Sequence, residues 1–98
     1  MKGILIAPGR EPVVTTLPEN LQDIEAWLGG HADQKYFSRT PAILMHSAAG
    51  RKPNRIWRGE VLCGTLLCYG WRGGRLQPLN KALQAELLDR LKDTEVRV

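Results

Sequence analysis

The chain has few cysteines and no long apolar run. Its 98 residues include two cysteines, Cys63 and Cys68, which is too few for the disulfide framework of a small secreted domain. They stand five positions apart, so on one continuous strand they would face opposite sides of a sheet, and we predict two reduced thiols. No apolar stretch approaches the roughly 20 residues of a membrane-spanning helix. The apolar start ends at Pro8, too early for a signal peptide, so we expect a cytoplasmic protein.

The common motifs of catalysis, metal binding and phosphate binding are also missing. Histidine and cysteine together number four, and their spacing matches neither C-x-x-C nor H-x-x-x-H. The P-loop and the dinucleotide-binding fingerprint do not occur. His46 and Cys63 could meet across adjacent strands as a base and its nucleophile, but a structural histidine is far commoner. We therefore predict a protein without enzymatic activity, metal or cofactor.

What the chain does have is the composition of one globular domain. Apolar residues make up 43% and charged residues 24%, close to the average of globular proteins. This length can bury a single modest core, so we predict one domain over residues 1–98, with residues 93–98 as a frayed tail. A domain this small buries a smaller share of its surface than a large one. We therefore expect copies of the chain to associate.

Periodicity predicts an α+β fold. Apolar residues spaced by three and four indicate two amphipathic helices, and runs rich in β-branched or apolar residues indicate strands. The strands are expected at residues 2–7, 12–17, 31–38, 42–46 and 61–71, and the helices at 18–30 and 79–91. Gly64 inside the last strand suggests a bulge or a close backbone contact, and residues 55–60 are ambiguous between loop and strand. The order predicts a mixed or antiparallel sheet of about five strands with both helices on one face.

The positive charge is concentrated in one segment. The net charge is +4, and residues 51–75 contain six basic side chains against one acidic side chain, Glu60. That segment alone carries +5, and the remainder of the chain carries −1. If the protein has an anionic partner, we therefore expect this segment to bind it.

Aromatic side chains alternate with the basic ones in this segment. Guanidinium groups bind phosphate or carboxylate through paired hydrogen bonds, and an indole face can stack on a base or hold a cation. The alternative, which the sequence leaves open, is a solvated rim of arginines around tryptophans that fill the core. The glycine-rich stretch 70–74 reads as a turn rather than a phosphate cradle. The predicted binding surface consists of Arg51, Lys52, Arg55, Trp57, Arg58, Trp71, Arg72 and Arg75.

Four short motifs occur in an order that resembles a known family. They are residues 4–12, the helix end at 27–30, the pair Asn54-Arg55 and the stretch 64–70. Together they resemble an uncharacterised family of small proteins from phages and mobile elements (a domain of unknown function, number three-eight-four-six). The basic character of residues 51–58 departs from many relatives, which look more acidic there. The resemblance implies a phage or mobile-element origin and life in the cytoplasm of a host cell, and it supplies no catalytic residue.

The leading hypothesis is a phage-type binding protein that antagonises a host process, in the first place a defence system. This is an analogy, since small phage accessory proteins commonly act by binding. The target would be an anionic surface of a host protein or a nucleotide-like small molecule, and the sequence does not choose between them. The alternative is a basic nucleic-acid-binding module. The charge and the tryptophans favour it, whereas the acidic first helix and the missing recognition-helix or RNP-like pattern argue against it.

Overall fold

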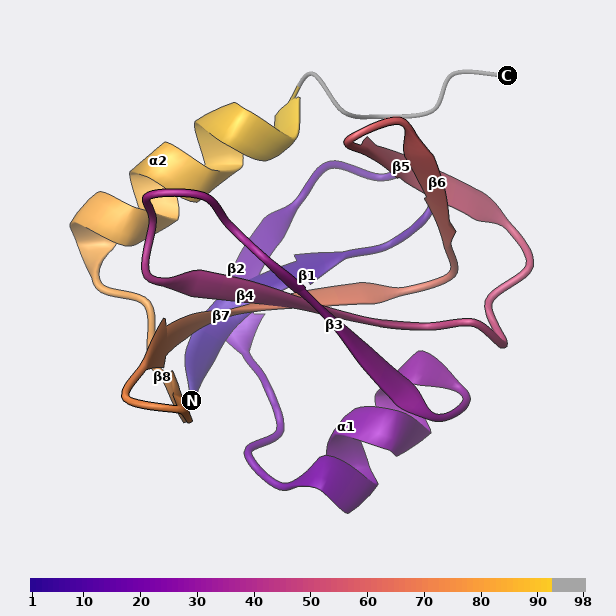
Figure 1. The fold of residues 1–98 in the computed structure, drawn as a ribbon, viewed down its shortest axis with the longest axis horizontal. Coiled ribbons are helices and arrows are strands. Elements are labelled where there is room, and N and C mark those ends of the chain that lie inside the picture. Colours follow the sequence, from indigo (N-terminus) through magenta and orange to yellow (C-terminus); the bar gives the residue numbers. More distant parts are fainter. Residues whose placement is uncertain (93–98) are drawn as a thin grey trace.

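The computed structural model describes residues 1–92, which form eight strands and two helices (Figure 1). In chain order they are β1 (Lys2–Ile6), β2 (Val13–Thr16), α1 (Leu21–Leu28), β3 (Ala32–Tyr36), β4 (Ala42–Ser47), β5 (Pro53–Trp57), β6 (Glu60–Cys63), β7 (Leu66–Arg72), β8 (Arg75–Gln77) and α2 (Lys81–Lys92). The predicted α+β class is confirmed. The predicted frayed tail, residues 93–98, lies outside the described residues.

The main sheet is antiparallel, with the strand order β2-β1-β7-β4-β3, and β8 pairs with the end of β7. The five strands of the main path match the predicted number, and β8 is an addition. β4 and β7 lie in the middle of the sheet, where Leu44 is opposite Cys68. All six residues of β4 are buried, as expected for a continuous apolar run that is covered on both faces.

The two helices lie on opposite faces of the sheet (Figure 1). Successive side chains of a strand point to opposite faces, so β4 and β7 each contribute to two separate cores. One core contains Leu44 and packs against Leu87 of α2. The other contains Ile43 and packs against Ile24 of α1. The prediction that both helices cover one face is therefore wrong, because the apolar run of β4 needs cover on both sides.

The stretch 61–71, predicted as one strand, is broken at Gly64. Residues 60–63, before the break, form β6, which pairs with β5 in a separate two-stranded hairpin. Residues 55–60, which were ambiguous between loop and strand, belong to this hairpin. Arg58 and Gly59 form its turn with φ values of 48° and 84°, and such pairs of positive φ are typical of tight hairpin turns. The close backbone contact predicted at Gly64 is confirmed, since a Cβ there would lie 2.9 Å from the Cα of Gly50.

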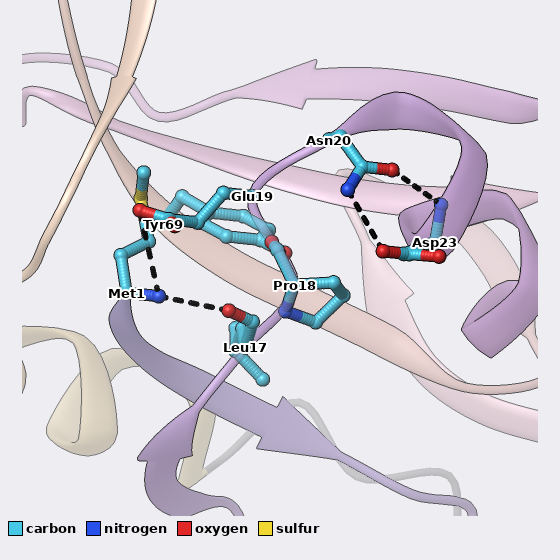
Figure 2. A network of polar contacts seen from close by, with 7 residues as sticks. All are labelled: Met1, Leu17, Pro18, Glu19, Asn20, Asp23 and Tyr69. Atoms are coloured by element: carbon cyan, nitrogen blue, oxygen red, sulfur yellow. Dashed lines mark hydrogen bonds and ion pairs between the residues drawn. The ribbon is translucent and has the colours of Figure 1, made fainter.

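Polar contacts at the start of the chain attach α1 to the sheet (Figure 2). The Tyr69 hydroxyl on β7 donates to the carbonyl of Pro18 at 2.6 Å, and the Met1 amine donates to the carbonyl of Leu17 at 2.8 Å. Burial raises the pKa of Tyr69, so its hydroxyl stays protonated and can donate. Asn20 caps the helix by accepting from the backbone N–H of Asp23 at 2.9 Å, and asparagine is a favoured residue at this position.

Candidate functional site

The structure does not bring the eight predicted site residues together on one surface. Arg55 is 2% exposed. Its Nη1 donates to the backbone oxygen and to Oδ1 of Asn54 at 2.9 and 2.8 Å, and its Nη2 donates to the carbonyl of Arg10 at 3.0 Å. The prediction that Arg55 belongs to an exposed binding surface is therefore wrong, because its guanidinium is buried and donates hydrogen bonds to oxygen atoms of the protein itself.

The remaining seven residues lie in different places. Arg51 and Lys52 are exposed in the loop between β4 and β5, at the opposite end of the sheet from the β7–β8 turn (Figure 1). Trp57 packs at the α2 side and meets the Phe37 ring edge to face, with centroids 4.8 Å apart. Trp71 packs at the α1 side. Both tryptophans are only partly buried, so each fills the edge of a core and keeps an exposed part.

Several arginines nevertheless converge on the turn between β3 and β4, residues 37–41. Arg90 of α2 donates from Nη1 to the hydroxyl of Thr40 at 2.8 Å. Arg58 of the hairpin reaches the carbonyl of Tyr36 from Nη2 at 3.5 Å, a long contact. Arg39 lies in the turn itself and is exposed.

The end of β7 joins this turn from the other side. The backbone N–H of Trp71 donates to the carbonyl of Pro41 at 2.8 Å. The centroid of the Trp71 ring lies 5.7 Å from that of the Tyr36 ring, with an interplanar angle of 64°. Arg72 follows and pairs in register with Arg75 across the β7–β8 turn. We call the whole set the basic turn, and it consists of Tyr36, Arg39, Trp57, Arg58, Trp71, Arg72, Arg75 and Arg90. It keeps five of the predicted residues and adds Tyr36, Arg39 and Arg90.

The charge around the basic turn is strongly positive. The basic turn has five guanidinium groups and no acidic residue of its own. They belong to Arg39, Arg58, Arg72, Arg75 and Arg90, which are all exposed. At the turn itself, the carboxylate of Glu86 accepts from the Thr40 hydroxyl at 3.2 Å. The guanidinium groups outnumber this carboxylate, so the surface favours anions.

Two hollows lie beside the basic turn, one lined in part by Pro41 and the other by Phe37. The larger has a volume of about 380 Å³ and is lined in part by Pro41, Trp71 and Arg72. The smaller has a volume of about 150 Å³ and is lined in part by Phe37, Arg58 and Arg90. A partner that covered the turn could therefore insert a side chain on either side of it.

A third concavity lies between β3, the end of β4 and the β5–β6 hairpin. We call it the His46 cleft, and its volume is about 390 Å³. His46 and Cys63, which the sequence suggested could meet, both line it. The charged residues of its lining are Asp33, Lys35 and Glu60. Sequence reasoning missed this cleft, because the hairpin that closes it was not predicted.

Among residues 1–92, no group of three or more His, Cys, Asp or Glu is placed to hold a metal ion. Burial raises the pKa of the Cys68 thiol to about 12, which makes it unreactive as a nucleophile. Neither helix of the structure is long and apolar enough to span a membrane, as far as residue 92.

Comparison with known proteins gives a family and no function. Neither a curated protein nor a solved structure matches the chain. A family model described as "Domain of unknown function (DUF3846)" matches residues 1–92, and this is the family whose motifs the sequence resembles. The chain therefore belongs to the DUF3846 family.

Proposed function

We propose that this chain is a non-enzymatic binding protein that holds an acidic surface of a partner protein on the basic turn. The observation that carries the proposal is the convergence of arginines from four parts of the chain on one turn. Guanidinium groups bind carboxylates through two parallel hydrogen bonds. Arginine, tyrosine and tryptophan are also the residues that contribute most at the centres of protein interfaces.

The arrangement of the tryptophans favours a protein over a nucleic acid. Proteins that bind single strands stack successive bases on aromatic side chains along one groove. Here Trp57 and Trp71 pack at opposite faces of the sheet, so the two rings offer no continuous stacking platform. The turn between them is exposed and rich in arginine, which suits an acidic partner surface.

The setting that we propose is antagonism of a host process, in the first place a defence system, in the cytoplasm of a host cell. It comes from the resemblance to small phage and mobile-element proteins, which commonly act by binding. In this setting the chain would mask an acidic surface that the host protein needs.

The proposal is tested with a fluorescent ten-residue peptide of alternating aspartate and tyrosine, measured by fluorescence anisotropy. We expect saturable binding that weakens as the salt concentration rises from about 50 to 200 mM, because the Debye length, about 10 Å at 0.1 M, shortens over this range and exposed charges are screened more strongly. A single-stranded oligonucleotide of similar length serves as the second probe. Tighter binding of the oligonucleotide would contradict the proposal in favour of a nucleic-acid-binding module, and binding of neither probe would contradict both.

Self-association also stays a prediction. The backbones of β2 and β3 form the two edges of the main sheet, and Val13 and Trp27 are large exposed apolar residues. Such edges and side chains are common sites of contact between copies. We expect light scattering at tens of micromolar protein to give a mass above that of one chain, and a monomer mass alone would contradict this.

A further inference from the structure

The His46 cleft is built by β3 and β4, which follow each other in the chain, and by β6 of the hairpin. Asp33 on β3 stands opposite His46 on β4, so both side chains point to the same face of the sheet. Glu60 on β6 pairs with Lys35 on β3 at 2.9 Å and closes one side of the cleft. The volume of about 390 Å³ falls in the range of about 300–1,000 Å³ that small-molecule sites occupy.

His46 and Ser47 are the buried polar residues that line this cleft. The Ser47 hydroxyl accepts from the backbone N–H of Ala49 at 3.2 Å. His46 is 8% exposed, and its Nε2 has no hydrogen-bond partner among residues 1–92. Buried polar atoms of proteins are nearly always paired, and an unpaired one needs an explanation. Burial, aided by the charge of Lys35 and opposed by Asp33 and Glu60, lowers the pKa of His46. The neutral ring that results has one nitrogen that can accept a hydrogen bond.

The charges of the cleft decide what kind of ligand it suits. Its lining has two carboxylates, Asp33 and Glu60, against one ammonium, Lys35, which is already paired with Glu60. The carboxylate of Asp33 is exposed, and no ion pair to it occurs among residues 1–92. A cationic ligand would find the carboxylate of Asp33 and a hydrogen-bond acceptor close together here.

We propose that the His46 cleft binds a small molecule with a protonated nitrogen, an amine or a guanidinium. Asp33 pairs with the cation, and His46 accepts a hydrogen bond from one of its N–H groups. The Lys35–Glu60 pair links the hairpin to β3 at one side of the cleft. This site is independent of the basic turn and has the opposite charge preference.

Histidine NMR can test the proposal directly, because the chain has only two histidines. The side chain of His31 is 86% exposed and serves as an internal control. We expect the imidazole signals of His46 to shift in a saturable way on addition of agmatine, with a dissociation constant of about 1 mM or below. The signals of His31 should not follow the same curve, and adenosine monophosphate, as an anionic probe, should not move His46.

A matched pair of variants separates the role of Asp33 from a general loss of negative charge. Asp33→Asn should weaken agmatine binding at least fivefold, about 1 kcal/mol. Asp89→Asn removes the same charge from an exposed position on α2 and should leave the affinity unchanged. Absence of a saturable His46 shift up to about 10 mM agmatine, tighter binding of adenosine monophosphate, or equal affinities of the two variants would each overturn the proposal. Charge reversal in the basic turn should not affect this binding, so the two proposals can fail separately.

Discussion

Replacing Asn54 by alanine is expected to destabilise the protein by about 3–5 kcal/mol, because it leaves several buried polar groups without partners. Asn54 is 1% exposed. Its Nδ2 donates to the carbonyl of Ile6 at 2.9 Å and to the carbonyl of Gly64 at 2.7 Å. Its Oδ1 accepts from the buried guanidinium of Arg55 at 2.8 Å. These contacts join the end of β1, the break after β6 and the start of β5.

The matched control for this experiment is Asn80→Ala. Asn80 is exposed and caps α2 by accepting from the backbone N–H of Leu83 at 2.8 Å, and removal of such a cap costs about 1 kcal/mol. Both variants lose the same side-chain atoms, so the difference in their free energies of unfolding isolates the buried network. Chemical denaturation measures both. If Asn54→Ala were no more destabilising than Asn80→Ala, the hairpin would not depend on this network.

The sequence was sufficient to predict the strands and helices that follow from the pattern of neighbouring residues. The apolar run of β4 and the spacing of Ile24 and Leu28 in α1 are local patterns, and the predicted strands and helices lie close to the observed ones. The face that each helix covers is not local, since it depends on the path of the chain over the sheet. The apolar run of β4 was nevertheless a usable signal, because such a run needs cover on both faces.

The buried state of Arg55 shows where a linear pattern fails. In β5 the usual alternation is reversed, so that Ile56 is 46% exposed and Arg55 is buried. Hydrophobicity alone would predict the opposite. The reason is the neighbouring Asn54, whose side-chain Oδ1 and backbone oxygen both accept hydrogen bonds from the Arg55 guanidinium. The asparagine-arginine pair is visible in the sequence as one of the motifs of the family resemblance, but by itself it does not predict that the arginine is buried.

The charge excess was predicted in the right part of the chain, but the site was not. Arg39 and Arg90 come from outside residues 51–75, and the contact of Arg90 with Thr40 spans 50 positions. Only the packing of α2 against the β3–β4 turn brings them together. The His46 cleft was missed for the same reason, since Asp33, His46 and Glu60 belong to three different strands.

Reversing two charges of the basic turn, in the variant Arg39→Glu with Arg72→Glu, is expected to weaken binding of the acidic peptide at least 100-fold, about 3 kcal/mol. Each change removes a guanidinium donor and places a carboxylate against the carboxylates of the partner. Both side chains are exposed, and such surface substitutions typically change stability by about ±0.5 kcal/mol. The loss of binding should therefore occur without a loss of the fold, which chemical denaturation of the same sample checks.

The matched control is Arg51→Glu with Lys52→Glu, which lowers the net charge equally. Both residues are exposed, but they lie at the opposite end of the sheet from the basic turn (Figure 1). If the position of the arginines matters, this control should bind within about threefold of the unmodified protein, the effect of a rim charge that is largely screened. Equal losses in the two variants would mean that the peptide senses only the net charge, and the basic turn would then be a solvated rim. A loss confined to the control would move the binding surface to the β4–β5 loop, next to the His46 cleft.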